Sequence, residues 1–395
     1  MEFPLHNYLK SLRDIGARDG YIKAIQRNAK PLADCGLPVI LTLGHLAHIT
    51  DVSHGILTDI IKRQIDPYRV FAIRKRNGGK RFICVPETGL LNAQRWIHDE
   101  ILCSLAATKN LSCHATAYAP GCSHVINAKR HVGAAWILKF DITRFFESIS
   151  ERQVYRVFRG LGYRSQVAFC LTRLCTRVLP TNVDHRLLRH TKRWQTGDQR
   201  NQRNFSGARV IGHLPQGAPT SPMLANLVCI PLDTDMQNIA AREGLTFTRY
   251  ADDMTFSGEM LDRAAAVKIS REVSIVVGRY GFGINLQKTS IAKNGGRKIV
   301  TGLSVDGDVV RLPRAYKDAI RQELFYLDKH GIQEHCARIG HKNHLSYLLR
   351  LAGRIRYATS IEPVIGQRMM HLFLRIFPTF QETERLIFQD FVSDD

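Results

Sequence analysis

The stretch Tyr250-Ala251-Asp252-Asp253 constrains the fold more than any other part of this sequence. It lies between residues 245–250 and 254–257, two segments that alternate in the manner of paired β-strands. Two adjacent carboxylates at a hairpin tip repel each other unless a cation holds them, and Mg²⁺ prefers carboxylate oxygen. The stretch therefore predicts a hairpin with a metal site at its tip. A solvated turn, for which Asp is also suited, is the alternative.

A third carboxylate lies upstream, where the apolar segment 137–140 ends at Asp141. Phosphoryl transfer assisted by two metal ions needs carboxylates that converge from separate strands. Asp141 together with Asp252 and Asp253 meets that need. The sequence predicts that these three side chains meet in space, although more than a hundred positions separate the first from the other two.

These motifs resemble the palm of reverse transcriptases. That family carries an acid at a strand end, then a loop and helix start like Leu-Pro-Gln-Gly-Ala-Pro-Thr-Ser-Pro at 214–222, then a Tyr-x-Asp-Asp hairpin. The resemblance implies an RNA-directed DNA polymerase. It also implies an α+β right-hand fold with fingers, a palm made of an antiparallel sheet flanked by helices, and a helical thumb.

Two shorter strings point to one branch of the family. Asn127-Ala128-Lys129-Arg130-His131 matches an Asn-Ala-x-x-His pattern, and Val300-Thr301-Gly302 matches a Val-Thr-Gly triplet; retron reverse transcriptases carry both at these places. The resemblance implies a structured non-coding RNA as template and primer, synthesis from a 2′-hydroxyl, an RNA-linked single-stranded DNA (msDNA) product, and an effector protein in defence against phage.

The resemblance also assigns the metal site. Asp141 and Asp252 are the expected principal ligands of two Mg²⁺ ions, Asp253 adds charge or a weaker bond, and the carbonyl of Ile142 completes a shell. Lys288 is expected to protonate or neutralise the leaving pyrophosphate, with an exposed structural lysine as the alternative.

The nucleotide pocket is assigned in the same way. Phe146 is expected beneath the sugar of the incoming dNTP, where its ring excludes a 2′-hydroxyl, whereas Phe145 is expected in the core. Gln216 and Gly217 are expected to shape the pocket floor, since glycine permits close backbone approach. Tyr250 is expected to brace the primer end.

Basic residues extend the expected interface to nucleic acid. Residues 68–73 and 81–85 predict two strands joined by a positively charged loop at 74–80, for which a solvated turn is the alternative. The resemblance implies that Lys80 and Arg81 grip the triphosphate and that Arg74 and Lys75 contact the template. The remaining expected RNA contacts come from the two retron strings and from a basic helical face near the C-terminus: Asn127, His131, Val300, Thr301, Gly302, Arg350, Arg354 and Arg356.

The charge of the chain supports a polyanionic partner. Lys and Arg total 56 against 35 acidic residues, a net charge of +21, and neutralising phosphates releases counterions. No apolar run is long enough to span a bilayer, and the start lacks a secretion signal. The sequence therefore favours a cytoplasmic protein without a membrane partner.

The domain expectation follows the resemblance. Residues 1–66 form an N-terminal helical region with helices near 7–17 and 41–65, and 67–140 form the fingers and the start of the palm, with a helix near 91–106. Residues 141–305 form the palm with a basic insertion at about 181–210, and 306–395 form a helical thumb with helices at 316–327, 345–357 and 365–376. His330, His335, Cys336, His341 and His344 are an alternative zinc cluster of irregular spacing.

Other functions remain open at this point. An intron-encoded or abortive-infection reverse transcriptase shares the palm motifs, although the lack of paired Cys-x-x-Cys motifs argues against an endonuclease domain. An RNA-dependent RNA polymerase shares the carboxylates but tends to have a polar residue at the position of Phe146. A polymerase-like RNA-binding scaffold that restrains an effector needs no catalysis, and intact carboxylates disfavour it.

Overall fold

The computed structural model describes residues 5–74, 78–178, 211–259, 263–293 and 295–380. They fall into two compact units: the first comprises Met1–Ser123 and Ile137–Ile291, the second His124–Trp136 and Ala292–Asp395. The second unit thus takes a short segment from the middle of the chain. Lys75 and the basic insertion at 181–210 lie outside the described residues.

The first unit begins with four helices, α1 (Leu5–Asp14), α2 (Asp19–Asp34), α3 (Leu43–Thr50) and α4 (His54–Ile61). The single helix expected over 41–65 is two helices, because Asp51 adopts a left-handed conformation with φ 52° and ends α3. The side chain of Thr42 caps the start of α3 by accepting from His45 N at 3.0 Å.

A two-stranded antiparallel hairpin follows, made of β1 (Tyr68–Arg74) and β2 (Lys80–Pro86). Its register runs from Tyr68 opposite Pro86 to Arg74 opposite Lys80, which confirms the two expected strands. The helix expected over 91–106 is divided into α5 (Thr88–Trp96), a π-helical segment η1 (Ile97–Leu102) and α6 (Leu105–Thr108).

The central sheet has four strands in the order β4-β5-β3-β6. They are β3 (Trp136–Asp141), β4 (Thr246–Tyr250), β5 (Asp253–Gly258) and β6 (Ser290–Ala292). Aromatic rings fill the space beside it: Phe256 lies 4.9 Å from Phe247 and 5.8 Å from Phe140 between ring centroids. Because β3 lies beside β5, the end of one strand is brought next to the β4–β5 hairpin.

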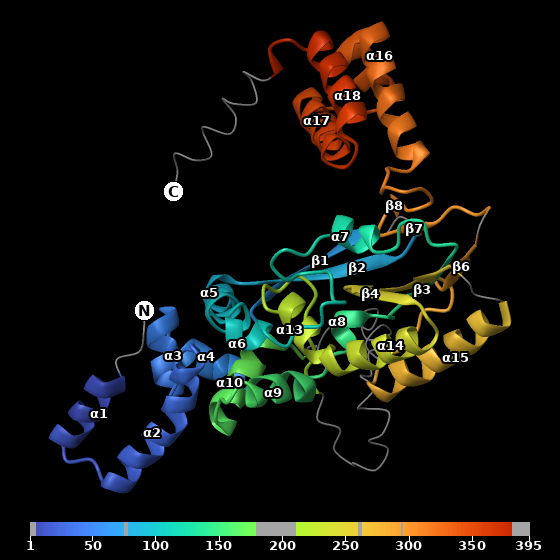
Figure 1. Ribbon diagram of the computed structural model, residues 1–395. Helices are drawn as coiled ribbons and strands as arrows, with labels where there is room; N and C mark the ends of the chain where they lie inside the picture. The colour runs from blue at the N-terminus through green and yellow to red at the C-terminus, as the bar shows by residue number, and fades with distance from the viewer. Residues whose placement is uncertain (1–4, 75–77, 179–210, 260–262, 294, 381–395) are drawn as a thin grey trace. The chain divides into compact units, whose positions relative to one another are not determined.

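Helices flank this sheet (Figure 1). Helices α14 (Ile230–Arg242) and α15 (Arg263–Arg279) run along one face of it. The first unit also contains α8 (Phe145–Ser148), α9 (Glu151–Gly160), α10 (Ser165–Cys175) and α13 (Ser221–Val228). Ser150 and Gln153 form a capping box at the start of α9. Helix α14 packs against both β4 and α15, so it supports the β4–β5 hairpin.

The second unit contains α7 (His124–Lys129), the short strands β7 (Ile299–Val300) and β8 (Leu303–Ser304), and three long helices. The helices are α16 (Arg314–Arg338), α17 (His344–Ile361) and α18 (Pro363–Ile376), and they pack against one another. All three helical segments expected in this region are present. Helix α16 is interrupted at Gly331, which has φ 71°.

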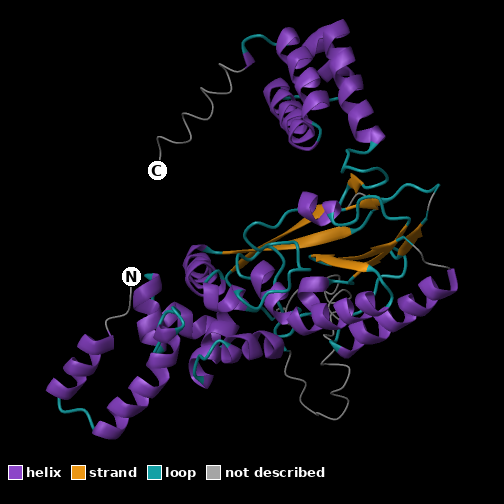
Figure 2. Ribbon diagram, viewed as in Figure 1, coloured by secondary structure: helices purple, strands orange, loops and turns teal. Residues whose placement is uncertain are grey.

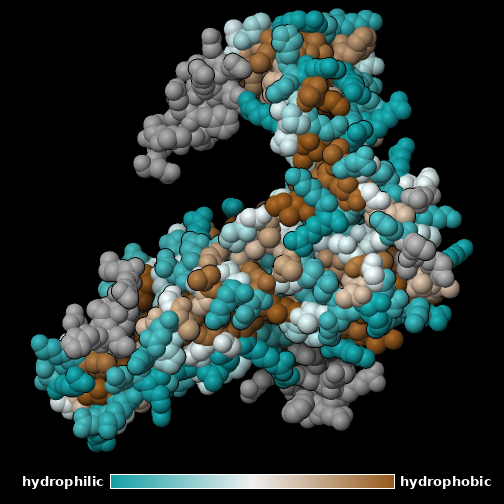
Figure 3. Space-filling model, in the orientation of Figure 1, coloured by the Kyte–Doolittle hydropathy of each residue, from teal (hydrophilic) through white to brown (hydrophobic). Residues whose placement is uncertain are grey.

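The expected α+β class is confirmed, with antiparallel strand pairs and many helices (Figure 2). On the face shown in Figure 3, hydrophilic residues cover much of the visible surface and hydrophobic residues form smaller patches between them. No helix in the described part of the chain has the length and apolarity needed to cross a membrane.

Candidate active site

The three predicted carboxylates lie at neighbouring strand ends. Asp141 is the last residue of β3, and Asp252 lies in the turn between β4 and β5, where Tyr250 pairs with Asp253. The N–H of Ile142, directly after Asp141, donates to the carbonyl of Asp252 at 2.9 Å. A main-chain bond therefore fixes the separation between the ends of the two strands that carry the acids.

The site holds more negative charge than its surroundings balance. Burial raises the pKa of Asp252 to about 6, and the charges of Asp253 and Asp141 add to this rise. Burial also raises the pKa of Asp253, which the nearby Lys139 opposes. Carboxyl groups with raised pKa values are common at functional sites.

Lys288 partly supplies that positive charge. Its Nζ lies 2.5 Å from Asp141 Oδ1, and Asn285 Nδ2 donates to the other oxygen of Asp141 at 3.3 Å. The hydrogen bond to Asp141 raises the pKa of Lys288. The Lys288 side chain is 56% exposed, so it can leave the carboxylate without disturbing the core.

The donor set fits Mg²⁺, because it consists of hard carboxylate oxygens with an excess of negative charge. Within the described residues, however, no three His, Cys, Asp or Glu side chains are already placed to hold a metal ion. In the active site, Asp141 is instead engaged by the Lys288 ammonium. Binding a cation there would require the Asp141–Lys288 contact to change.

Beneath the hairpin, a buried ion pair supports the turn. Arg249 donates to both carboxylate oxygens of Asp233, at 2.6 and 2.8 Å, and both side chains are 0% exposed. The same guanidinium donates to the carbonyl of Ala251 at 3.2 Å and to Asn226 Oδ1 at 3.3 Å. Ala251 has φ 57°, so Arg249 holds the residue whose left-handed backbone forms the tip.

Phe146 lies at the edge of the core. Phe145 is buried, with its ring 5.9 Å from that of Phe282, whereas Phe146 is half-buried with its ring 5.5 Å from that of Phe145. The difference matches the expected division between a core ring and a ring available to a ligand. The ring of Tyr118, which the sequence did not single out, lies 6.2 Å from that of Phe146.

The Gln216–Gly217 loop packs against the fingers hairpin. Cys84 N on β2 donates to the carbonyl of Gln216 at 2.8 Å. Gly217 has φ 108°, and a Cβ there would lie 2.7 Å from Ile83 Cγ2, so only glycine fits. The predicted need for close backbone approach is met, with β2 as the neighbour that requires it.

The basic residues of the hairpin are exposed. Arg74, Lys80 and Arg81 all lie at the turn end of the hairpin, where Arg74 pairs with Lys80. The positive charge of Arg81 opposes the rise in the pKa of Tyr118. Lys75, the fourth predicted contact, lies outside the described residues.

The two retron strings both lie in the second unit. Thr301 Oγ1 donates to the carbonyl of His124 at 2.8 Å, and α7 packs against β8, so the β7–β8 hairpin is joined to α7. Asn127 and His131 are each 1% exposed and Val300 is 0% exposed, so these three side chains lie in the interior. Their burial does not support the expected direct contact with RNA. Gly302 is exposed.

The expected basic face of the thumb is partly neutralised. Arg350 donates to Glu323 at 3.0 Å, and Arg354 is also paired with Glu323. Arg356 is exposed. The sequence could not show this pairing, because Glu323 comes from a different helix, α16.

The alternative zinc cluster is not formed. His335 and Cys336 are buried, and His335 Nε2 lies 2.9 Å from the hydroxyl of Tyr347. No metal-holding group of His, Cys, Asp or Glu occurs among the residues that the structure describes. This part of the thumb is a packed His and Tyr cluster.

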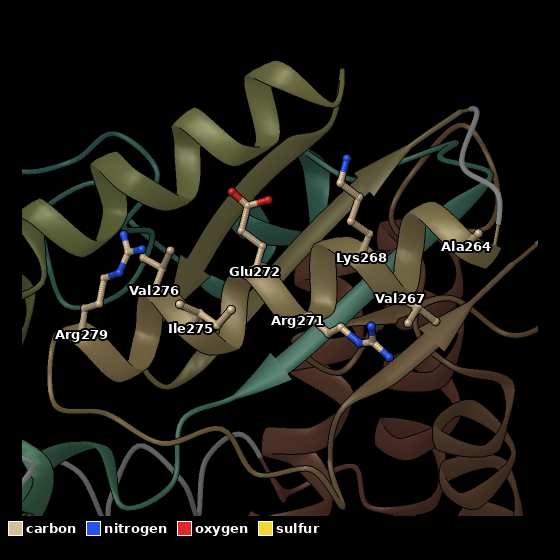
Figure 4. A pocket seen from close by; sticks show the side chains of 8 residues that line it. All are labelled: Ala264, Val267, Lys268, Arg271, Glu272, Ile275, Val276 and Arg279. Atoms are coloured by element: carbon tan, nitrogen blue, oxygen red, sulfur yellow. The ribbon is translucent and has the colours of Figure 1, made fainter.

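A shallow hollow on α15 lies apart from the predicted site residues. Figure 4 shows its lining, in which the exposed Val267 and Ile275 alternate with Lys268, Arg271 and Arg279. All the residues that line it come from this one helix. Asp141, Asp252 and Asp253 therefore lie outside this hollow.

Comparison with known proteins agrees with the motifs. The reverse transcriptase (RNA-dependent DNA polymerase) family model matches residues 73–327. Retron Mx65 reverse transcriptase of Myxococcus xanthus is 30% identical over 349 residues, which cover 86% of this chain and 72% of the relative. Retron Ec86 reverse transcriptase of Escherichia coli is 28% identical over 353 residues, which cover 87% and 97%. Retron Mx162 reverse transcriptase of Myxococcus xanthus is 35% identical over 280 residues, which cover 66% and 52%.

Proposed function

This chain belongs to the retron reverse transcriptases, and from that premise we propose that it copies a structured non-coding RNA into single-stranded DNA that stays joined to the RNA. The family membership makes it an RNA-directed DNA polymerase with a right-hand fold. The observation that carries the proposal is the bond between Ile142 N and the Asp252 carbonyl, which sets the acids of two strands side by side.

Asp141 and Asp252 would hold two Mg²⁺ ions, with Asp253 adding negative charge and the Ile142 carbonyl a further oxygen. When bound, such ions lower the pKa of an attacking hydroxyl and stabilise charge on the transferring phosphate. The raised pKa of Asp252, about 6, supports this assignment because the site as it stands lacks positive charge.

The other side chains orient the substrates. Phe146 would lie beneath the sugar, where its ring leaves no room for a 2′-hydroxyl, and dNTPs would be preferred over rNTPs. Lys80 and Arg81 would bind the triphosphate; their side chains are exposed beside the turn of the hairpin, and the charge of Arg81 acts on Tyr118. Gln216 and Gly217 would form the pocket floor, and Lys288 would neutralise or protonate the leaving pyrophosphate once released from Asp141.

The remaining parts would serve the nucleic acid. Tyr250 would brace the primer end, and Arg74 and Lys75 would contact the template. In the second unit, Thr301, Gly302 and Arg356 keep exposed or partly exposed positions for RNA contact. The net charge of +21 supports a phosphate-rich partner. As the resemblance of its motifs to the retron family implies, the chain would act in the cytoplasm, with an effector protein, in defence against phage.

The first test isolates the nucleic acid that co-purifies with the full-length protein from cells that carry its locus, and sequences it before and after RNase treatment. Wild type is expected to yield a DNA that carries a covalently attached RNA remnant. The double variant D252N/D253N is expected to yield the RNA without DNA.

A matched control is Asp235→Asn on α14, because Asp235 accepts from the Tyr280 hydroxyl at 2.8 Å and an amide oxygen can accept the same bond. This variant should retain the DNA product. DNA in D252N/D253N would contradict the catalytic assignment. Protection from phage by D252N/D253N without any DNA would favour the scaffold function instead.

A further inference from the structure

Tyr118 is an aromatic residue at the active site that no sequence motif marked. Its ring lies 6.2 Å from that of Phe146 at an interplanar angle of 45°, and 41% of the residue is exposed. The charge of Asp252 acts on it, and Ala115, three residues earlier, pairs with Arg249 of β4. Tyr118 therefore lies close to both the proposed sugar gate and the catalytic hairpin.

The backbone of Tyr118 is held in an unfavourable conformation. Its φ is 66°, in the left-handed region that an L-residue with a large side chain rarely adopts. Strain of this kind persists only where the surrounding structure enforces it, and it is concentrated at functional sites. The placement of this ring is thus imposed by its neighbours.

Hydrogen bonds on both sides of residues 114–117 impose this conformation on Tyr118. Thr116 N donates to the carbonyl of Arg249 at 2.9 Å, and Arg249 N donates to the carbonyl of His114 at 2.8 Å, so the segment runs along β4. Asn226 Nδ2 donates to the carbonyl of Ala117 at 2.7 Å, and this Asn226 is the residue that Arg249 also contacts. The network that holds the catalytic turn therefore also holds the loop that presents Tyr118.

Phe146 contacts two aromatic rings. The ring of the buried Phe145 lies 5.5 Å from that of Phe146 between centroids, and the ring of Tyr118, carried by the loop that β4 and Asn226 hold, lies 6.2 Å from it. Burial and the charges of Asp252 and Tyr250 raise the pKa of Tyr118 to about 12, so its hydroxyl stays neutral at any working pH. A neutral ring can stand beside a triphosphate without repelling it.

We propose that Tyr118 is a positioning residue for sugar selection: its ring packs against Phe146 and keeps that side chain in the rotamer that excludes a 2′-hydroxyl. This inference rests on the proposed role of Phe146 as the sugar gate. Without the Tyr118 ring, Phe146 gains room to rotate, and the excluded volume beneath the sugar becomes incomplete.

The test measures kcat/KM for dGTP and for GTP with the full-length protein on one RNA template and DNA primer. Tyr118→Ala is expected to lower the dGTP to GTP preference roughly tenfold, the scale on which pocket contacts discriminate, mainly through better use of GTP. Tyr118→Phe is expected to keep the wild-type preference, because the ring and not the hydroxyl does the packing. The matched control Tyr21→Ala removes a similarly exposed tyrosine, 54% exposed on α2, and should change nothing.

A double-variant cycle with Phe146→Ala separates this inference from the gate itself. If Tyr118 acts through Phe146, Y118A/F146A has the same preference as F146A alone. An unchanged preference in Y118A, beside a lost preference in F146A, overturns the role of Tyr118 and leaves the gate intact. If the losses of preference in Y118A and F146A multiply in the double variant, the role of Tyr118 is also overturned, because Tyr118 would then act on the nucleotide directly.

An unchanged preference in F146A overturns the gate, and the inference with it. Thermal denaturation accompanies each measurement. Tyr118→Leu, which keeps side-chain bulk over the loop without a ring, replaces the alanine variant if the latter does not fold, and the same loss of preference is expected.

Discussion

Buried charge is neutralised on one side of the β4–β5 hairpin and left unneutralised on the other. Beneath it, Arg249 and Asp233 are both 0% exposed and neutralise each other through two hydrogen bonds. At its tip, Asp252 and Asp253 lie beside Asp141 with too little positive charge, and the pKa of Asp252 is raised to about 6. Balanced charge indicates a structural role here, and unbalanced charge indicates a place where a ligand completes the site.

Removing one partner of the buried Arg249–Asp233 pair should have the largest effect on stability. Arg249→Met leaves the Asp233 carboxylate buried without a partner, and we expect a loss of about 3–5 kcal/mol in the free energy of unfolding, measured by urea denaturation. The double variant R249M/D233L should recover much of it, because both charges are then removed. The exposed pair Arg314–Asp318 is the control, and R314M should change stability little. A loss in R249M no larger than in R314M would contradict the comparison.

His213 is a buried base whose charged form is also disfavoured by its surroundings. Burial, together with the charges of Arg177 and Arg63, lowers its pKa to about 3, so the folded protein keeps it neutral. A lowered pKa means that the unfolded state binds the proton first, and stability falls as the pH drops from about 6.5 towards 3. At pH 5 this costs up to about 2 kcal/mol.

We therefore expect His213→Gln to lose less stability than wild type between pH 7 and pH 5, measured as the difference in Tm at the two values. His98→Gln, at an exposed ion pair with Asp99, is the control and should keep the wild-type difference. An identical pH dependence in wild type and H213Q would show that another group controls acid sensitivity.

Removing the charge of Asp252 at the hairpin tip should stabilise the protein. The raised pKa of Asp252 means that its ionised form costs free energy above about pH 6, and that this cost disappears as the pH falls through 6 towards the usual value near 3.8. In EDTA at pH 7.5, Asp252→Asn should gain on the order of 1–2 kcal/mol. The gain should vanish below about pH 4. If D252N is less stable than wild type at pH 7.5, the negative charge at the hairpin tip is neutralised after all, and the contrast with the Arg249–Asp233 pair is wrong.

Lys288 should give the smallest change in stability. Its ion pair with Asp141 is half exposed, so Lys288→Ala should alter the free energy of unfolding by less than about 1 kcal/mol. Turnover should fall about a hundredfold if Lys288 assists the leaving pyrophosphate. The exposed Lys268→Ala on α15 is the control for both measurements. Full turnover in K288A would identify Lys288 as a structural counterion only.

The strands of the site could be predicted from sequence because alternation is a local property. The segment 137–140 is mostly apolar and the segments 245–250 and 254–257 alternate, and β3, β4 and β5 form there. Helix boundaries were less accessible. The segment 41–65 keeps helical periodicity on both sides of Asp51, and only the left-handed conformation of that residue divides it.

The roles of individual polar residues depended more on the fold. Arg350 and Arg354 look like an exposed basic face in sequence, yet Glu323 of α16 pairs with both. Asn127 and His131 look like RNA contacts, yet both are buried. Tyr118 carries no motif, and its importance follows from a positive φ and from Phe146, which lies in a distant part of the sequence.

By itself, the sequence determined the family and the polymerase class and predicted which carboxylates form the site, because acids at strand ends and a hairpin tip are short local patterns. Only the tertiary structure decided which charges are compensated and which ring stands beside Phe146. Those properties come from pairs such as Arg249 with Asp233 and Tyr118 with Phe146, whose members lie on separate elements. Burial and electrostatic balance are set by such long-range contacts, which no local pattern of residues encodes.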